Sequence, residues 1–358
     1  MAIEQLTSWS GHSNKPFIIA GPCSAETEHQ VVETALRLKA TDKVHLLRAG
    51  IWKPRTRPDS FEGVGEKGLP WLAEAKAQTG FKTCVEVANS KHAELAMKHG
   101  VDVLWVGART TVNPFSVQDI ADAVTGVDIP VMVKNPINPD IALWMGGIER
   151  FEKAGITKLA GIHRGFSDYS ESIYRNKPLW QLPIELRRVR PDIPLINDPS
   201  HICGRRDLLA RVSQKAMDLN FDGLMIESHI TPDDAWSDAA QQVTPEAFSN
   251  LVDALVLRKR DNTDPKYIEA ISSWRAEIDE IDQRLFHLLA ERMKAVKEIG
   301  EFKKDEGITI LQDERWKNIF EQALTKADSY GLSPEFITNY LRAVHDESIN
   351  NQEGIMNS

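Results

Sequence analysis

The residues that could do chemistry in this 358-residue chain stand at or soon after the ends of short apolar runs, with Asp238 eleven residues beyond the last run. One set of four offers sulfur, nitrogen and two carboxylates: Cys23, His201, Glu227 and Asp238. This mixture suits a borderline divalent transition metal such as Mn²⁺, Fe²⁺, Co²⁺ or Zn²⁺. Mg²⁺ and Ca²⁺ prefer oxygen ligands, so the mixture disfavours them. A single cysteine is more often a packing residue, and the metal prediction therefore depends on all four residues converging.

A second set of residues at or just after the ends of these runs is cationic. It consists of Arg48, Lys53, Arg55, Arg109, Lys134 and Arg164. Taken singly, such residues are normally solvated at the surface, because charged side chains are rarely buried without a partner. Six on one face predict small polyanionic substrates, since arginine holds phosphate or carboxylate through paired hydrogen bonds. Together the two sets predict a reaction that joins or cleaves two anionic molecules, with a metal polarising a carbonyl.

The apolar runs predict the fold that would bring these residues together. Eight of them alternate with amphipathic stretches: FIIAG (17–21), VHLLRAG (44–50), KTCVEV (82–87), VDVLWVG (101–107), PVMVK (130–134), KLAGI (158–162), PLIND (194–198) and DGLMIE (222–227). Eight strand–helix units over about 250 residues predict an α/β fold of the (β/α)8 barrel type. A doubly wound sheet, usually of about five or six strands, is the second choice. In a barrel the chemistry lies at the C-terminal strand ends, where both sets fall.

Composition narrows the class of protein further. The formal net charge of −9 argues against a nucleic-acid partner, because phosphate backbones attract basic surfaces. No apolar run approaches the ~18 residues of a membrane span. The first residues, MAIEQLTSWS, lack the basic flank and apolar core of a signal peptide. Three cysteines cannot form a disulfide framework, so we expect a cytoplasmic protein.

The sequence pattern changes near residue 260. The segment RKRDNTDP (258–265) is charged and ends on a proline, which is typical of a linker. Beyond it, apolar residues recur at helical spacing in three segments: 266–304, 313–328 and 335–350. We therefore divide the chain into three parts: a barrel domain (1–260), a linker (261–265) and an all-α domain (266–358).

Three basic residues stand among apolar neighbours on the first of these helices. Arg292 and Lys303 lie about 20° apart around a helix, on one face, whereas Arg275 lies about 25 Å from Arg292 along the axis. One small ligand cannot touch Arg275 and Arg292 of the same straight helix. If all three serve one site, Arg275 comes from a second, antiparallel copy, which predicts an intertwined homodimer. The alternative is a solvated or coiled-coil helix with scattered basic residues.

The barrel motifs resemble a known enzyme family. In order they are GPCSAE, LRAGIWKPRTRP, KTCVEVANS, GART, VMVKNP, GIHRGF, DPSH and GLMIESH…WSDAAQQ. Over roughly residues 16–245 they resemble a type I 3-deoxy-D-arabino-heptulosonate 7-phosphate (DAHP) synthase, of the compact subgroup related to 3-deoxy-manno-octulosonate 8-phosphate (KDO8P) synthase. The resemblance implies that Cys23, His201, Glu227 and Asp238 hold the metal, with Mn²⁺ as the first choice.

The same resemblance implies the substrate positions of the barrel. Those for phosphoenolpyruvate, also the candidate catalytic residues, are Lys53, Arg109, Lys134 and Arg164, with Glu86 nearby. Gly107 and Ala108 of the GART motif count with the substrate-binding positions. Those for erythrose 4-phosphate are Arg48 and the loop Lys53, Pro54, Arg55 and Thr56. KDO8P synthases carry an Asn-Arg pattern in that loop, so Lys-Pro-Arg-Thr favours the four-carbon aldose and leaves KDO8P synthesis as the alternative.

The implied reaction agrees with the residue types. A metal would polarise the aldehyde carbonyl of erythrose 4-phosphate, so that C3 of phosphoenolpyruvate can attack it. Water would add at C2, after which phosphate leaves. The cations would offset the repulsion between two anions held a few ångströms apart. Lys134 or a metal-bound water is the candidate for proton transfer.

The helical region resembles a second family. WRAEIDEIDQRLFHLLAERMKAVKEIGEFKK, followed by ILQDER and DESINNQ, is similar to an all-α chorismate mutase of the AroQ class over about 266–353. The resemblance implies a set of chorismate-binding positions: Arg275, Arg292, Lys303, Gln312, Arg315, Ser348 and Gln352. Arg292 and Lys303 would be catalytic, by stabilising the ether oxygen during rearrangement to prephenate. Two positions depart from the family, where an acidic residue is replaced by Gln312 and a glutamate by Trp316.

The two resemblances predict a bifunctional enzyme of aromatic amino acid biosynthesis. It would open the shikimate pathway in the barrel and convert the end product of that pathway in the helical domain. The alternative is that the helical domain is a non-catalytic regulatory and dimerisation module. Because the two reactions are not consecutive, we also expect prephenate or chorismate bound at the helical domain to lower synthase activity.

Overall fold

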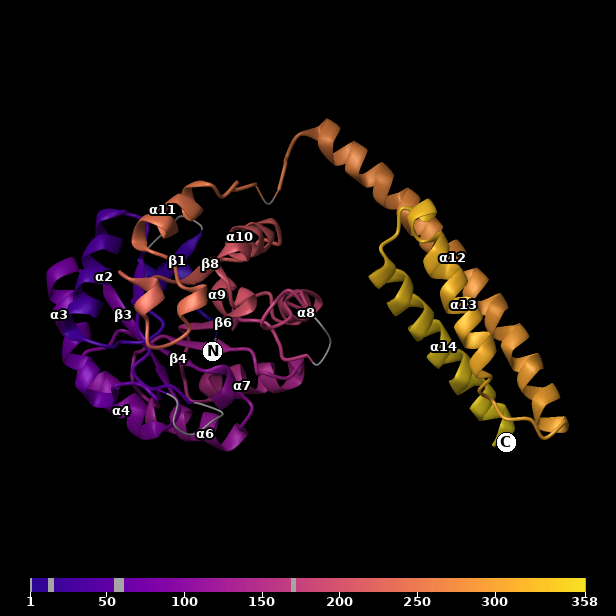
Figure 1. The fold of residues 1–358 in the computed structure, drawn as a ribbon, viewed down its shortest axis with the longest axis horizontal. Helices are drawn as coiled ribbons and strands as arrows, with labels where there is room; N and C mark the ends of the chain where they lie inside the picture. The colour runs from indigo at the N-terminus through magenta and orange to yellow at the C-terminus, as the bar shows by residue number, and fades with distance from the viewer. Residues whose placement is uncertain (1, 12–15, 55–60, 169–171, 260, 358) are drawn as a thin grey trace. The chain divides into compact units, whose positions relative to one another are not determined.

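The computed structural model describes residues 2–11, 16–54, 61–168, 172–259 and 261–357. The chain divides into two compact units, Met1–Arg260 and Asp261–Ser358. In the first unit eight strands form a closed parallel barrel in sequence order, which confirms the predicted fold (Figure 1). They are β1 (Phe17–Gly21), β2 (Leu46–Arg48), β3 (Lys82–Val87), β4 (Val103–Val106), β5 (Val131–Lys134), β6 (Leu159–His163), β7 (Leu195–Asn197) and β8 (Gly223–Glu227). β1 closes the barrel against β8, with Gly21 opposite Glu227.

Helices surround the strands (Figure 1). The longer ones are α2 (Glu28–Ala40), α3 (Leu69–Thr79), α4 (Ser90–Lys98), α6 (Pro114–Ala123), α7 (Ile141–Lys153), α8 (Gln181–Val189), α10 (Leu209–Asp218) and α11 (Pro245–Asp253). Shorter turns are α1 (Leu6–Ser10), α5 (Ala108–Thr111), α9 (Pro199–Cys203), η1 (Gly65–Gly68), η2 (Arg206–Leu208), η3 (Pro232–Asp234) and η4 (Ala239–Gln241). Side chains that cap first-turn N–H groups include Thr27, Asn89, Asn113, Asp140, Asp198 and Thr244. These caps tie the helices directly to the loops that follow the strands.

The apolar residues of the barrel form two layers. One lies between strands and helices, where Leu104 and Trp144 are fully buried. The other fills the barrel interior and includes Trp105 and Met132. Strand residues alternate between the two layers because successive side chains point to opposite faces. Trp9 of α1 packs against the first residue of β1, so α1 covers the N-terminal end of the barrel. The opposite, C-terminal end of the barrel carries the predicted site residues, most of which are polar or charged.

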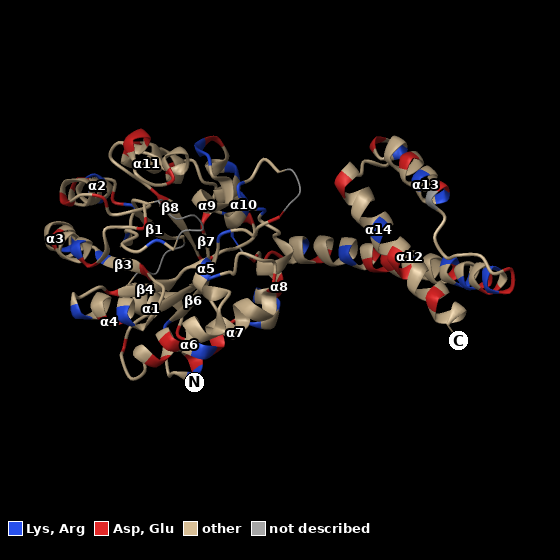
Figure 2. Ribbon diagram, turned by 60° about the horizontal axis from the view of Figure 1, so that its bottom comes forward, with Lys and Arg blue, Asp and Glu red and all other residues tan. Residues whose placement is uncertain are grey.

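Charged residues are sparse on the strands and frequent on the outer helices and loops (Figure 2). The charged groups that do end strands are therefore exceptional. Arg48 ends β2, Lys134 ends β5 and Glu227 ends β8, and each of these side chains is buried. Since charges are rarely buried without a function or a partner, these three mark the C-terminal end of the barrel as the candidate site.

The residues that follow α11 are held by a side chain of α10. α11 ends at Asp253, and the chain then leaves the helix. The side chain of Gln214 on α10 accepts from the N–H of Val256 and donates to its C=O, at 2.9 and 3.0 Å. These two bonds attach the segment after α11 to α10.

The second unit is all-α, as predicted. It consists of α12 (Pro265–Asp305), α13 (Asp313–Lys326), the short turn η5 (Asp328–Tyr330) and α14 (Pro334–Met356). α14 packs along α12, and Val296 and Ser348 are buried between them. Within the described residues, no helix is long and apolar enough to cross a membrane.

Candidate active sites in the barrel and the helical unit

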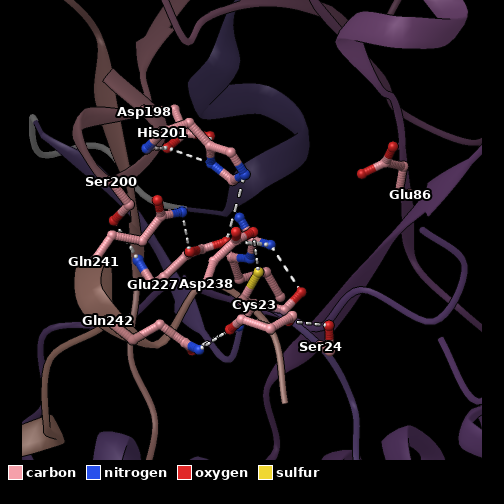
Figure 3. Close-up of polar contacts among 12 residues, drawn as sticks. Cys23, Ser24, Glu86, Asp198, Ser200, His201, Glu227, Asp238, Gln241 and Gln242 are labelled. Carbon is pink, nitrogen blue, oxygen red and sulfur yellow. Dashed lines mark hydrogen bonds and ion pairs between the residues drawn. The ribbon is translucent and has the colours of Figure 1, made fainter. Parts of the chain in front are cut away.

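Four elements position the predicted metal ligands at the C-terminal end of the barrel. Cys23 follows β1, His201 lies in α9, Glu227 is the last residue of β8, and Asp238 directly precedes η4. In Figure 3 their side chains point toward a common space, with Cys23, Glu227 and Asp238 on one side and the His201 ring on the other. Cys23 Sγ lies 3.2 Å from Asp238 Oδ2, and His201 Nε2 lies 3.7 Å from Glu227 Oε1.

These residues meet as two pairs rather than as one tight group. Among the described residues, no three His, Cys, Asp or Glu side chains lie close enough together to hold a metal ion. Glu227 Oε1 is buried and accepts no hydrogen bond from any described group, although Arg48 Nη2 lies 3.1 Å away. The structure thus brings the four predicted metal ligands to one end of the barrel and leaves Glu227 Oε1 without a hydrogen bond from the described groups.

Each candidate ligand is oriented by a second side chain that motif reading did not assign. Gln241 Nε2 donates to Glu227 Oε2 at 2.7 Å, and Gln242 Oε1 accepts from the N–H of Cys23 at 2.9 Å. Arg175 Nη1 donates to Asp238 Oδ1 at 2.9 Å. Asp198 contacts the fourth ligand, with its Oδ2 at 2.8 Å from His201 Nδ1. Such partners fix the orientation of metal-binding side chains in general.

Asp198 also connects the metal candidates to the cations. Its carboxylate is fully buried at the end of β7, and Oδ2 accepts from Lys134 Nζ at 2.8 Å. Burial opposes its charge, but His201 and Lys134 hold the pKa of this carboxyl well below its usual range. The contact with Nδ1 leaves Nε2 of His201 directed toward Glu227. Asp198 was visible in the DPSH motif, but its type alone did not indicate that it joins the two sets.

The predicted cations surround these residues. Arg48 is buried, with Nη2 at 3.3 Å from the C=O of Cys23, and Lys53 Nζ donates to Cys23 Sγ at 2.5 Å. Arg164 follows β6, and burial lowers the pKa of its guanidinium to about 10, with Arg109 among the neighbours that add to the shift. Arg109 itself is exposed in α5. Pro54 is half-buried, while Arg55 and Thr56 lie outside the described residues.

The surroundings shift the pKa values of Cys23 and Asp238 in opposite directions. Burial raises the pKa of the Cys23 thiol to about 12, and the negative charge of Glu227 adds to the shift. Burial also opposes ionisation of Asp238, but Lys53 and His201 hold its pKa well below the usual range. Burial lowers the pKa of His201 despite the nearby carboxylates. In this arrangement the thiol keeps its proton and Asp238 is ionised.

Glu86 lies at the side of the site, away from the four metal candidates (Figure 3). Its Oε2 accepts from Trp105 Nε1 at 3.2 Å. An added Cβ at Gly107 would lie 2.0 Å from Glu86 Oε1, so only glycine leaves room for this carboxylate. The predicted Gly107 therefore acts through the space that it provides, and the buried Ala108 starts α5 directly after it.

The helical unit brings together part of its predicted site. Arg292 Nη1 donates to Ser348 Oγ at 2.6 Å, and Lys303 is buried, with Nζ donating to the C=O of Ile310 at 2.5 Å. Gln352 is buried beside Gly300, and its Oε1 accepts no hydrogen bond from any described group. These residues lie on facing sides of α12 and α14.

Other predicted residues of the helical site are exposed rather than buried between α12 and α14. Arg275, Gln312 and Arg315 are exposed. Because α12 is one continuous helix, Arg275 lies about 25 Å from Arg292 along its axis. Trp316, at a position that departs from the resembled family, stacks on His345 of α14 with ring centroids 4.0 Å apart. It therefore serves packing between α13 and α14.

Comparisons with known proteins agree with this organisation. Residues 2–260 match the family model "DAHP synthetase I family", and residues 274–353 match "Chorismate mutase type II". The phospho-2-dehydro-3-deoxyheptonate aldolase of Thermotoga maritima is 33% identical over 235 residues, which cover 66% of this chain and 67% of that protein. The T-protein of Haemophilus influenzae is 31% identical over 86 residues, 24% of this chain and 23% of that protein.

A solved structure and a more distant relative complete the comparison. The crystal structure of the Thermotoga maritima DAHP synthase matches with a TM-score of 0.60 and 32% identity, over 66% of this chain and 67% of that chain. The 2-dehydro-3-deoxyphosphooctonate aldolase of Wolinella succinogenes is 25% identical over 267 residues, 67% of this chain and 98% of that protein. Both resemblances drawn from the motifs are confirmed: the chain belongs to the DAHP synthetase I family and carries, after its barrel, a chorismate mutase type II domain.

Proposed function

We propose that residues 1–260 condense phosphoenolpyruvate with erythrose 4-phosphate to DAHP and phosphate. Residues 266–358 would rearrange chorismate to prephenate, with 261–265 as the linker. The observation that carries the first part is the ring of buried charge at the C-terminal end of the barrel. There Arg48, Lys134 and Glu227 end three strands of a family-matched barrel.

The residues present suit a divalent transition metal. Cys23, His201, Glu227 and Asp238 would hold it, since they supply sulfur, nitrogen and carboxylate oxygen. Glu227 Oε1 is a buried oxygen without a hydrogen bond among the described groups. The ammonium group of Lys53 lies 2.5 Å from Cys23 Sγ and 3.8 Å from Asp238 Oδ2. Cys23 and Asp238 therefore face a positive charge in the structure, at the place where the metal would bind. When bound, the metal, with Mn²⁺ first and Fe²⁺, Co²⁺ or Zn²⁺ as alternatives, would polarise the aldehyde carbonyl.

The side chains of the chain itself would bind and orient two anions. Lys53, Arg109, Lys134 and Arg164 would hold the phosphate and carboxylate of phosphoenolpyruvate, while Arg48 and the loop that begins at Lys53 hold erythrose 4-phosphate. Their charges oppose the repulsion between the substrates, which would be several kcal/mol at moderate dielectric. The C3–C1 bond then forms, water adds at C2, and the C2–O bond to phosphate breaks. Lys134, held by Asp198, is the candidate to carry a proton.

The four-carbon aldose is the proposed acceptor. The Lys53-Pro54-Arg55-Thr56 sequence favours it over the five-carbon arabinose 5-phosphate. Identity is also higher to the heptonate aldolase, at 33%, than to the octonate aldolase, at 25%. Initial rates with each aldose at equal concentration test this choice. Faster turnover of arabinose 5-phosphate would replace the proposal with KDO8P synthesis.

The helical unit would act as a homodimer. The first half of α12 exposes an apolar stripe that α13 and α14 leave uncovered, including Trp274 at 61%, Ile278 at 55% and Leu285 at 50% exposure. A second copy would cover this stripe and bring its Arg275 to the Arg292 of the first. Arg292 and Lys303 would then bind the substrate carboxylates and stabilise the ether oxygen. Gln352, whose buried Oε1 has no hydrogen-bond partner in the described part of the chain, would take part in the same site together with Gln312, Arg315 and Ser348.

The fusion itself supports a regulatory role for the helical unit. The two reactions are not consecutive, so we propose that prephenate or chorismate bound there lowers synthase activity. Unchanged synthase kinetics with saturating prephenate and chorismate would remove this part of the proposal. The three cysteines are free and buried, which agrees with a cytoplasmic enzyme.

Two substitutions in the full-length chain test the assignment of both activities. Lys134→Ala should abolish DAHP formation and leave prephenate formation unchanged. Arg292→Ala should do the reverse, because the two residues lie in separate compact units. If Arg292→Ala has no effect on prephenate formation, the helical unit is a regulatory module only.

A further inference from the structure

Trp105 is a buried residue of the barrel interior that the sequence pattern marks only as part of a strand. It is the third residue of β4 and is fully buried. It lies in register with Glu86 on β3, and its Nε1 donates to Glu86 Oε2 at 3.2 Å. An indole N–H inside a barrel needs an acceptor, and here the acceptor is a carboxylate of the candidate site.

Two cations of the same site lie against the Trp105 ring. Arg48 Cζ is 5.0 Å and Lys134 Nζ is 5.8 Å from its centroid. Both distances fall within the range of a cation–π interaction. One indole thus contacts three charged side chains from three different strands: β2, β3 and β5.

The hydrogen bonds of Arg48 show why an aromatic face matters there. The side chain is 1% exposed, and its Nη2 faces Glu227, yet Nε and Nη1 have no hydrogen-bond partner among the described groups. A carboxylate in place of the indole would occupy those N–H groups and cancel the charge. A ring face offsets part of the cost of burying the cation and leaves the N–H groups available to an anion.

We propose that Trp105 is a positioning residue for the phosphorylated anionic substrates of the barrel. Its ring contacts both Arg48 and Lys134 at cation–π distances, and its N–H orients Glu86. Arg48 and Lys134 each have a carboxylate neighbour, Glu227 and Asp198, and the attraction to the ring adds to the stabilisation of both buried cations before a substrate anion arrives. The inference rests on the proposed synthase function, since it is the substrates of that reaction that the cations would bind.

Two variants separate the ring face from the N–H. Trp105→Phe keeps an aromatic face and removes the donor to Glu86, whereas Trp105→Gln keeps a donor and removes the face. We expect the KM for phosphoenolpyruvate to rise at least about 10-fold in Trp105→Gln and less than about 3-fold in Trp105→Phe, as the loss of two buried cation–π contacts requires. The dissociation constant of phosphoenolpyruvate, measured by calorimetry without the aldose, should change in the same order.

Trp144 of α7 supplies the matched control. It is also fully buried, but it lies in the outer layer and its Nε1 donates to the C=O of Val133 at 3.0 Å. The same two substitutions there should lower the melting temperature and leave both substrate KM values unchanged. Should Trp105→Gln fail to fold, Trp105→Met takes its place with the same threshold.

The outcomes distinguish a failure of the proposed Trp105 role from a failure of the proposed synthase function. A KM within about 3-fold of wild type for the variant without a ring, or an equal loss in Trp105→Phe, would overturn the role of the ring face. Wild-type protein that forms no DAHP would instead refute the proposed function itself. The chorismate mutase activity of each preparation gives an internal standard for protein concentration.

Discussion

The barrel site and the helical site differ in how much of each is assembled within one chain. In the barrel, candidate residues from positions 23 to 238 meet at one end, and Cys23, His201, Glu227 and Asp238 each have an orienting partner. In the helical unit, Arg292 meets Ser348, but Arg275 lies about 25 Å away on the same helix. The candidate residues of the barrel site thus all come from one copy, whereas the proposed helical site would take its Arg275 from a second.

Geometry explains this difference. A closed parallel barrel places all strand ends on one ring, so residues remote in sequence converge without any partner. A pair of antiparallel helices brings residues together only along their shared line of contact. Arg275 lies on the half of α12 whose apolar stripe α14 leaves exposed, so the proposed site at Arg292 would take its Arg275 from a second molecule. The barrel should therefore tolerate changes that disable the helical site, and the reverse.

The largest effect is expected from Lys134→Ala, which should lower DAHP formation by at least about 1,000-fold. The substitution removes a buried cation from the substrate site and leaves Asp198 with His201 as its remaining partner. DAHP and prephenate formation are measured on the same preparation, with melting temperature as a check of folding. Lys158→Ala, which breaks the ion pair with Asp128 at the other end of the barrel, is the control. Retained turnover would remove Lys134 from the mechanism.

A charge on the apolar stripe of α12 tests the need for a second copy. Ile278→Asp should lower mutase activity by about 100-fold and shift the protein toward monomer, because burying an unpaired carboxylate in an interface is costly. Synthase activity without pathway ligands should stay within about 2-fold, since the candidate residues of the barrel site all come from one compact unit, which does not include Ile278. Sedimentation and both assays report the result. Gln283→Asp adds the same charge on the opposite side of the helix and should change neither; a fully active monomeric Ile278→Asp would refute the shared site.

The third expected effect is on stability. Burial lowers the pKa of His163 at the end of β6 to about 4, from an ordinary value of 6.5. As pH falls below 6.5, His163 becomes protonated in the unfolded chain, whereas in the folded barrel it stays neutral until about pH 4. Stability is therefore full above pH 6.5, and at pH 5 about 2 kcal/mol is lost. Urea unfolding of the barrel at pH 7 and pH 5 measures the loss.

A matched pair of variants isolates this histidine from the others. His163→Gln should lose less stability between pH 7 and pH 5 than wild type, whereas His287→Gln, exposed on α12, should lose the same amount as wild type. An unchanged pH slope in His163→Gln would show that the buried imidazole does not carry the effect. Acid pH should therefore destabilise the barrel through His163, whereas the exposed His287 of the helical unit should contribute nothing to the loss.

Much of the barrel could be predicted from its sequence because two physical rules act locally. β-branched runs alternating with amphipathic stretches indicate strands and helices, and the polar residues at strand ends meet by closure of the barrel. The long helix was equally predictable, and its continuity gives the expected separation of Arg275 from Arg292. The homodimer that this separation implies stays a prediction.

The residues that motif reading missed have contacts that no local pattern encodes. Arg175, Gln241 and Gln242 lie in loops or a short turn, where periodicity says nothing about the path of the chain. Trp105 is placed in the interior by strand alternation, but its contact with two cations depends on the register of neighbouring strands. The segment after α11 is attached to Gln214 of α10, a contact between distant positions that no local pattern could reveal.

The smallest effect is expected where an orienting partner, rather than a candidate ligand, is removed. Gln241→Ala deletes the donor to Glu227 Oε2 and the acceptor for Arg175, and should weaken metal binding by about 10-fold. Competition with a chelator in the full-length protein gives the dissociation constant for Mn²⁺. Gln214→Ala, whose amide contacts Val256 away from the site, is the control. Prephenate formation should not change in either variant, because the helical unit contains none of these residues. An unchanged dissociation constant for Mn²⁺ would mean that the barrel ligands need no orienting partner, and that the two sites differ only in whether one chain brings their residues together.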